Sequence, residues 1–168
     1  MVYLGVDCIP GGSWCSIFNG EVRHYPFSKS RKDIADHVDR MIGLSYTHDR
    51  NDCRILAVVR GYKRISFNKM YSDKTLARAI LMERTCSILE ARGVVVAPVL
   101  LSDAAIGLGI PLDDVTGEIH RSSVLKMISK SYKKLFVDMD KAEKEKHSVS
   151  TMLALYNKKY ANIRGRIF

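Results

Sequence analysis

The first 25 residues constrain the fold more than any other part of the chain. Residues 2–6 form an apolar run that ends at a single carboxylate, Asp7, and a Pro-Gly-Gly turn follows at residues 10–12. A second apolar run covers residues 13–18, and Asn19-Gly20 is a typical hairpin signal before a third run at residues 21–25. The pattern predicts three antiparallel strands, with one acidic residue at the exit of the first strand.

The rest of the chain alternates helical and strand patterns. Apolar residues at helical spacing predict helices over residues 30–43, 73–93, 121–135 and 148–156, and continuous apolar runs predict buried strands over residues 54–59 and 94–97. In the long helix we expect Asp73 as the cap and an apolar stripe of Leu76, Ile80, Ile88 and Leu89. The element order predicts an α/β fold, with a mixed sheet covered by helices on both faces.

The length and composition indicate one globular domain. The chain has 168 residues, of which 46% are hydrophobic and 27% are charged. We expect a domain over residues 1–157 and a mobile basic tail over residues 158–168, with a charged connection at residues 138–145. Residues 100–117 receive no assignment.

The net charge of +9 favours a polyanionic partner, foremost nucleic acid, although an anionic membrane or an acidic protein also fits. No apolar run approaches the roughly 20 residues that span a bilayer. Asp7 interrupts the first apolar stretch and no basic leader precedes it, so we expect no signal peptide and a cytoplasmic protein.

The cysteine and histidine pattern argues against a zinc site. The four cysteines are Cys8, Cys15, Cys53 and Cys86, and they form no Cys-x-x-Cys pair and have no histidine at ligand spacing. We expect buried free thiols in a reducing compartment. Trp14 is expected in the core, and His147 at the start of the last helix. The other histidines, His24, His37, His48 and His120, show no pattern.

Five local patterns together resemble one known family. They are Leu4-Gly5-Val6-Asp7, Glu90-Ala91-Arg92-Gly93-Val94, Ala97-Pro98, Arg121-Ser122-Ser123-Val124 and the stretch from Ser148 to Leu155. The sequence resembles the RuvC family of Holliday junction resolvases, and the resemblance runs over nearly the whole chain. It implies an RNase H-like (RuvC-type) α/β fold with a mixed five-stranded sheet and helices on both faces.

The departures from this family concern its catalytic acids. Such nucleases need three or four carboxylates around two metal ions. The resemblance places the acids other than Asp7 at Val59 (or, with a one-residue shift, Arg60), Ser148 and Thr151, none of which is acidic. No Asp or Glu occurs from Cys53 to Ser72 or from Lys146 onward, so small shifts of the alignment do not restore them.

One carboxylate supplies too little charge to hold a catalytic metal ion. We therefore expect no metal site and no cofactor, magnesium binding no tighter than about millimolar, and no cleavage of nucleic acid. Glu83, Asp103, Asp113, Asp114 and Glu118 could be recruited instead. That leaves open an active, magnesium-dependent resolvase with a rearranged site.

Basic and aromatic residues form the candidate binding surface. In the resembled family, the loop after the fourth strand contributes to the junction-facing surface and to the dimer contact, and an aromatic residue helps to open the junction at the position of Tyr62. Basic residues neutralise phosphates, and aromatic rings stack on unpaired bases. The alternative is that the aromatic residues of this loop complete the core. The candidate binding residues are Arg60, Tyr62, Lys63, Arg64, Lys69, Arg121, Lys126 and Lys130.

The sequence therefore predicts a catalytically inactive RuvC-like relative. It would bind branched or single-stranded nucleic acid, or serve as an adaptor for proteins; a pure protein-interaction component with no nucleic-acid role is the third hypothesis. The resemblance implies a homodimer through the long helix, with Met70, Leu81, Met82 and Thr85 on its outer side. A compact resolvase relative suits a bacteriophage, which would place it in the host cytoplasm.

Overall fold

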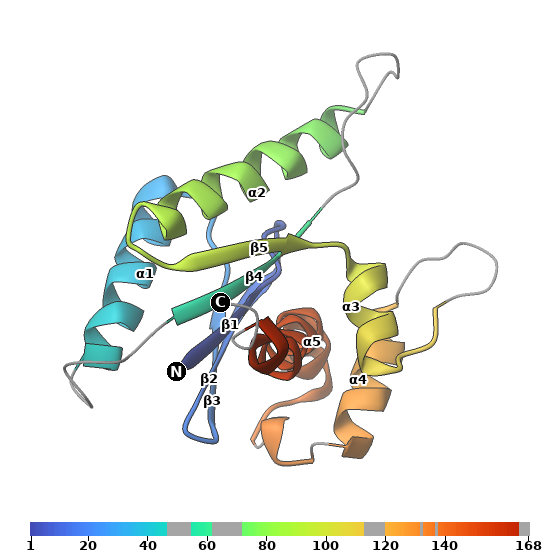
Figure 1. Ribbon diagram of the computed structural model, residues 1–168. Helices are drawn as coiled ribbons and strands as arrows, with labels where there is room; N and C mark the ends of the chain where they lie inside the picture. Colours follow the sequence, from blue (N-terminus) through green and yellow to red (C-terminus); the bar gives the residue numbers. More distant parts are fainter. Residues whose placement is uncertain (47–54, 62–71, 113–119, 132, 137, 165–168) are drawn as a thin grey trace.

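A mixed five-stranded sheet forms the centre of the computed structural model, with strand order β3-β2-β1-β4-β5 (Figure 1). The structure describes residues 1–46, 55–61, 72–112, 120–131, 133–136 and 138–164. The strands are β1 (Val2–Val6), β2 (Ser13–Phe18), β3 (Glu21–Pro26), β4 (Ile55–Arg60) and β5 (Val95–Val99). β1, β2 and β3 pair antiparallel, whereas β1, β4 and β5 pair parallel, so the predicted mixed sheet is confirmed.

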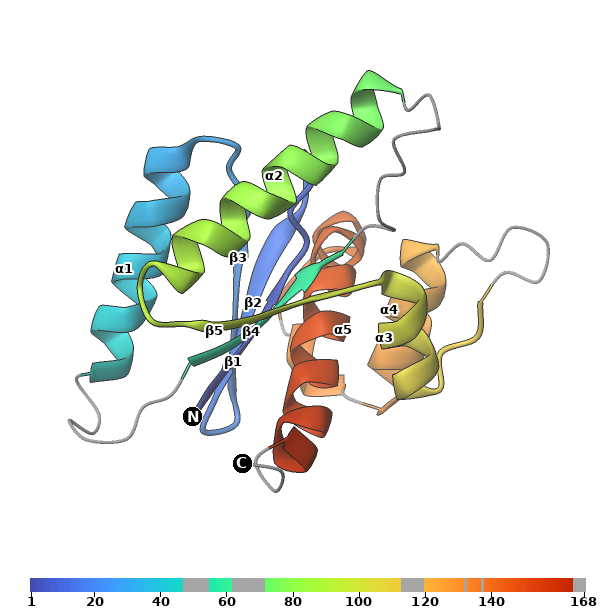
Figure 2. The same cartoon turned by 45° about the horizontal axis from the view of Figure 1, so that its top comes forward.

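Helices cover both faces of this sheet (Figures 1 and 2). They are α1 (Arg31–Tyr46), α2 (Asp73–Glu90), α3 (Leu101–Leu108), α4 (Arg121–Ser131) and α5 (Lys141–Arg164), with a short 3-10 helix η1 (Lys133–Phe136). α1 and α2 lie on one face, and α5 lies on the other with α3 and α4 beside it. The described helices include none that is long and apolar enough to cross a membrane.

Each face of the sheet has its own hydrophobic core. Successive residues of a strand point to opposite faces, so β4 sends Val59 into one core and Val58 into the other. The first core joins the sheet to α1 and α2 and contains Trp14, which is 1% exposed, as the sequence predicts. The second core joins the sheet to α3, α4 and α5.

A glycine allows α5 to lie directly on the central strand β1. A Cβ atom at Gly5 would be 2.0 Å from the carbonyl oxygen of Ser150 and 2.3 Å from the backbone nitrogen of Ala154. Farther along α5, Asn157 Nδ2 donates to the carbonyl oxygens of Leu4 and Leu56, at 3.1 Å and 2.7 Å. These contacts fix α5 across the strands that carry the candidate site.

The last helix is longer than the sequence predicts. α5 begins at Lys141, where the backbone nitrogen of Glu143 donates to Asp140 Oδ1 at 2.8 Å and caps the first turn. It continues to Arg164, so residues 141–145 and 158–164 are helical and the expected connection and tail are wrong there. Residues 141–145 lack an apolar stripe, but their Lys, Ala and Glu residues are good helix formers. In the second segment, Tyr160 continues the apolar side of the helix from Tyr156, with ring centroids 4.5 Å apart, and its hydroxyl group donates to the carbonyl oxygen of Gly107 at 3.1 Å.

The buried face of α2 also differs from the prediction. Ile88 and Leu89 of the predicted stripe are buried, but Leu76 and Ile80 are exposed at 38% and 59%. Leu81, Met82 and Thr85, expected on the outer side, are buried. α2 carries apolar residues around most of its circumference, so their spacing does not decide which stripe packs on the sheet. Met70, the fourth expected interface residue, lies outside the described residues.

Three smaller predictions also change. Ser72, not Asp73, caps α2, because Ser72 Oγ accepts from the backbone nitrogen of Thr75 at 3.3 Å. β5 continues through Pro98, which an edge strand tolerates. The unassigned stretch after residue 100 contains α3, which ends at Gly109 with a φ of 71°.

Candidate functional site at the carboxyl ends of β1 and β4

Asp7 and Arg60 lie side by side where two parallel strands end. The register pairs Val6 of β1 with Val59 of β4, so the next residue on each strand is Asp7 and Arg60, respectively. Arg60 Nη1 donates to Asp7 Oδ1 at 2.9 Å. The Asp7 side chain is fully buried, and the Arg60 side chain is 18% exposed. The ion pair is therefore largely removed from water.

A second arginine contacts the other oxygen of the carboxylate. Arg121 is the first residue of α4, and its Nη2 donates to Asp7 Oδ2 at 3.1 Å. The Arg121 side chain is 35% exposed. We name these three residues the Arg60–Asp7–Arg121 cluster. One carboxylate and two guanidinium groups leave the cluster with a net positive charge.

The backbone around Asp7 is held by the turn that follows β1. The backbone nitrogen of Asp7 donates to the carbonyl oxygen of Ser13 at 2.9 Å, and its own carbonyl oxygen accepts from Ile9 at 2.9 Å. A Cβ atom at Gly12 would lie 1.9 Å from the Asp7 carbonyl oxygen, so only glycine permits this close return. The position of Asp7 is thus fixed by the chain itself as well as by the arginines.

The other positions expected for acids hold buried neutral side chains. Val59 belongs to the first hydrophobic core. On α5, Ser148 Oγ donates to the carbonyl oxygen of Glu145 at 2.7 Å, and Thr151 Oγ1 donates to that of His147 at 2.8 Å. A Ser or Thr hydroxyl group is uncharged, and both of these donate to the backbone of their own helix, so neither supplies an anionic ligand.

These residues do not fit a two-metal centre. Among the described residues, no three His, Cys, Asp or Glu side chains come together in a group that could hold a metal ion. A metal ion at Asp7 would have to displace two guanidinium groups from the carboxylate oxygens. Of the acids considered for recruitment, Glu83 and Asp103 are exposed on α2 and α3, and Asp113, Asp114 and Glu118 lie outside the described residues.

The structure unites two histidines that the sequence left unconnected. His24 of β3 lies with Nε2 2.9 Å from Thr151 Oγ1, its ring centroid is 4.9 Å from that of His147, and it stacks on Phe136. Burial and the neighbouring His147 lower the pKa of His24 to about 4. Burial also lowers the pKa of His147, which lies within α5 rather than at its start. The sequence signal for part of this group is the four-residue spacing of His147 and Thr151, which places both residues on one face of a helix.

The predicted binding residues divide into three groups. Arg60 and Arg121 meet at Asp7, as described above. Lys126 and Lys130 are exposed on α4, the helix that Arg121 begins. Tyr62, Lys63, Arg64 and Lys69 lie outside the described residues.

The fold is similar to solved structures of resolvases. RuvC from T. thermophilus in complex with a Holliday junction substrate matches with a TM-score of 0.55 and 11% identity, over 97% of this chain and 96% of that chain. T. thermophilus RuvC in a second structure matches with a TM-score of 0.50 and 12% identity, over the same shares. The yeast mitochondrial Holliday junction resolvase matches with a TM-score of 0.45 and 13% identity, over 98% of this chain and 83% of that chain. No family model and no curated protein sequence matches the chain.

The sheet order, the helices on both faces and the similarity to T. thermophilus RuvC define an RNase H-like α/β fold. Within that class, the fold is of the RuvC type, as the sequence predicts.

Proposed function

We propose that this protein is a catalytically inactive RuvC-like protein that binds the phosphodiester backbone of nucleic acid at the Arg60–Asp7–Arg121 cluster. The observation that carries the proposal is the contact of two guanidinium groups with both oxygens of Asp7, at 2.9 Å and 3.1 Å. Arg121 remains 35% exposed, so a phosphate can approach it from solvent.

The electrostatics of the cluster support binding without cleavage. In a two-metal nuclease, the metal ions attract the phosphate and also activate the attacking water. Guanidinium groups supply the first property, because they carry a permanent charge and match the geometry of phosphate oxygens. They do not supply the second, because they stay protonated and do not generate hydroxide.

The surroundings of the cluster favour a nucleic acid over a small phosphate. Lys126 and Lys130 are exposed on the helix that begins with Arg121, one helical turn apart, and extend the positive charge along α4. A repeating phosphate backbone neutralises several such cations at once. T. thermophilus RuvC has been solved with a Holliday junction substrate, so a four-way junction is the first ligand to test, followed by single-stranded DNA.

Salt-dependent binding tests the proposal directly. Fluorescence anisotropy would measure the affinity for a four-way junction, a single strand and a duplex over a range of salt concentrations. Arg121→Gln should weaken binding and reduce the salt slope by about one, the value for one lost phosphate contact. The matched control is Arg92→Gln. Arg92 also pairs with an aspartate, Asp39, but it precedes β5 and so lies at the opposite end of the parallel strands.

Asp7→Asn separates a binding site from a nuclease site. Removal of the negative charge should maintain or strengthen binding to the four-way junction, once circular dichroism has shown that the variant is folded. Incubation of the wild-type protein with manganese and the junction should give no specific cuts. Paired nicks that disappear in Asp7→Asn would establish the active-resolvase alternative. Absence of salt-dependent binding to all three DNAs would exclude the nucleic-acid role.

A further inference from the structure

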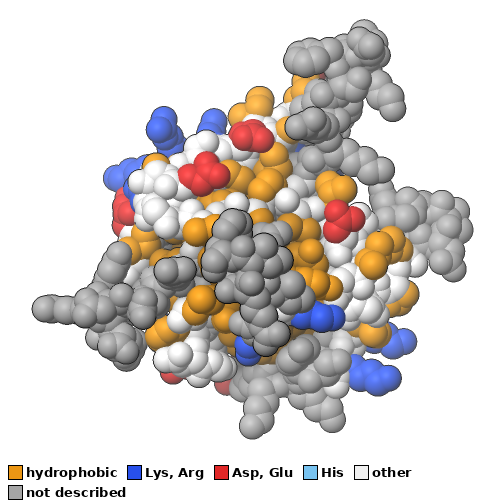
Figure 3. Space-filling model, in the orientation of Figure 1, with side chains coloured by type: hydrophobic (Ala, Val, Ile, Leu, Met, Phe, Trp, Pro, Cys, Tyr) orange, Lys and Arg blue, Asp and Glu red, His pale blue; other side chains and the backbone are white. Residues whose placement is uncertain are grey.

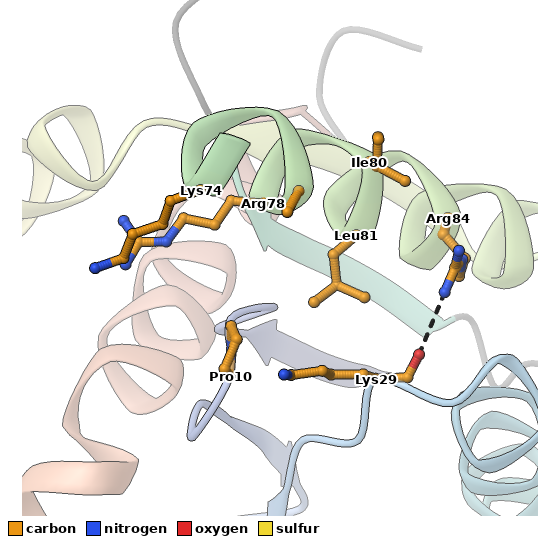
Figure 4. A pocket seen from close by; sticks show the side chains of 8 residues that line it. Pro10, Lys29, Lys74, Arg78, Ile80, Leu81 and Arg84 are labelled. Atoms are coloured by element: carbon orange, nitrogen blue, oxygen red, sulfur yellow. Dashed lines mark hydrogen bonds between the residues drawn. The ribbon is translucent and has the colours of Figure 1, made fainter. Parts of the chain in front are cut away.

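A second cationic surface lies along α2 and shares no residue with the Arg60–Asp7–Arg121 cluster. It is a groove with a volume of about 580 Å³ (Figure 4), which we name the α2 groove. Its cations are Lys74, Arg78 and Arg84 of α2 and Lys29 from the segment before α1. Its apolar lining consists of Pro10, Ala77, Ile80 and Leu81.

The two walls of the groove are tied together. Arg84 Nη1 donates to the carbonyl oxygen of Lys29 at 3.3 Å, which joins α2 to the segment before α1. Figure 4 shows the Lys29 side chain extending from that segment toward Pro10, below Leu81. This contact fixes the two walls of the groove to each other within the protein itself.

Charge and apolar surface alternate within the groove. Its described lining contains four cations and no acid. Ile80 lies among them with 59% of its surface exposed, and it is one of five exposed large hydrophobic residues in the described chain. A large exposed apolar residue within a concave site indicates a docking surface. Its partner must supply both negative charges and apolar side chains.

We propose that the α2 groove binds an acidic amphipathic segment of a partner protein. Carboxylates of that segment would pair with Lys74 and Arg78, and its apolar side chains would cover Ile80 and Leu81. A helix places such residues on one face at spacings of three and four positions, which suits a groove between a helix and a neighbouring segment. This binding activity is additional to the proposed nucleic-acid binding and does not depend on it.

Two other occupants fit the lining less well. Phosphates would neutralise the cations but leave Ile80 uncovered, and bases stack mainly on aromatic rings, of which the described lining has none. A second copy of the chain in a two-fold dimer would place the same patch on both sides of the contact. The four cations of one groove would then face the four of the other.

A designed peptide provides the test with the full-length protein. The probe is a fluorescent helical peptide of roughly four turns, with Leu at positions i, i+3, i+4 and i+7 and Glu on the flanking positions; a scrambled peptide of equal composition is its control. We expect binding that is about tenfold weaker for the scrambled peptide, because only the ordered one presents a single apolar face.

Variants of the groove locate the binding. The double variant K74E/R78E should weaken peptide binding about tenfold and I80S about fivefold, as expected for loss of exposed ion pairs and of one apolar contact. The matched controls should bind like the wild type: K141E/K158E makes the same charge change on exposed positions of α5, and I106S removes an exposed isoleucine from α3.

Each alternative has its own signature, and each overturns the proposal. Equal binding of the ordered and scrambled peptides, or unchanged binding by K74E/R78E, would show attraction by charge alone. If junction DNA displaces the peptide, and K74E/R78E weakens DNA binding whereas I80S does not, the groove is a nucleic-acid site. If sedimentation shows a dimer and I80S dissociates it, the groove is the contact with a second copy of the chain. No binding of the peptide at millimolar concentration would leave the proposal wrong, whatever Arg121→Gln does to DNA binding.

Discussion

Asp7 and Arg60 leave two adjacent parallel strands at the same level and form an ion pair of 2.9 Å. At this edge of the sheet, the resemblance to RuvC implies a second acid close to Asp7. The neighbouring strand here supplies a cation instead, and Arg121 supplies another from α4. Two carboxylates at these strand ends would repel each other unless a metal ion lay between them. In this chain, the Asp7 carboxylate instead attracts the two guanidinium groups.

The first prediction concerns the contribution of this cluster to stability. Asp7→Ala should lower the free energy of unfolding by about 3 kcal/mol, because it leaves two guanidinium groups without a compensating charge. Arg121→Ala should cost less than Arg60→Ala, since Arg121 is 35% exposed and Arg60 is 18% exposed. Urea unfolding at pH 7 measures all three. Equal stability of Asp7→Ala and the wild type would show that the cluster does not hold these elements together.

The sequence predicts this fold well wherever a local pattern corresponds to a buried element. The strand–turn–strand pattern around Asp7 gives β1, β2 and β3, because an Asn-Gly turn and apolar runs act over a few residues. The helical crossovers then determine that β4 and β5 are parallel to β1. The absence of an acid at Val59, Ser148 and Thr151, where the resemblance would place one, is equally visible, because it is a matter of residue identity.

The remainder depends on tertiary packing. Arg60 and Arg121 lie 61 positions apart and meet at Asp7 only because α4 begins near the end of β1. The exposed position of Ile80 follows from the rotation of α2 on the sheet, which its apolar spacing does not determine. In both cases, the deciding contact is distant in sequence. The charged start of α5, by contrast, is helical without an apolar stripe because its Lys, Ala and Glu residues are good helix formers.

The second prediction is that magnesium does not stabilise the fold. If magnesium binds at Asp7 with a dissociation constant of about 1 mM or weaker, 1 mM metal adds at most about 0.4 kcal/mol to the free energy of unfolding. Thermal unfolding with magnesium and with EDTA should therefore give closely similar midpoints. A rise of several degrees that Asp7→Asn abolishes would reveal a metal site and support the active-resolvase alternative.

The third prediction tests the close approach of α5 to β1. Gly5→Ala should prevent stable folding or cost several kcal/mol, because its Cβ would overlap the backbone of α5 at 2.0 Å from the Ser150 oxygen. Gly43→Ala is the matched control on α1, where an added Cβ meets nothing within 4 Å. It should stabilise the protein by about 0.5–1 kcal/mol through helix propensity. Comparable stabilities of the two variants would contradict the packing of α5.

The fourth prediction concerns thiol reactivity. Burial raises the pKa of Cys8 and of Cys15 to about 12, and that of Cys86 to about 11. The thiolate is the reactive form, so these three thiols should resist iodoacetamide at pH 8 in the native protein and react fully in urea. Mass spectrometry of peptides measures each one separately. Rapid native labelling of Cys15 would contradict its burial in the core that joins β2 to α5.

The fifth prediction is that stability falls with acidification through His24. The pKa of His24 is lowered from 6.5 to about 4 in the folded protein, first by burial and then by His147. The unfolded chain binds the proton more readily, so the stability that His24 contributes is complete above pH 6.5 and is lost as the pH falls toward 4. His37, whose pKa is also lowered to about 4, acts in the same direction.

Replacement of His24 isolates its share of this pH dependence. His24→Gln retains a polar group beside Thr151, which lies 2.9 Å from His24 Nε2, but it cannot take up a proton. The free energy of unfolding of this variant should therefore fall less steeply between pH 7 and pH 4.5 than that of the wild type. If urea unfolding at several pH values gave parallel curves for His24→Gln and the wild type, His24 would not be the group that takes up the proton on unfolding, and the buried contact of β3 with α5 would have no part in the pH dependence.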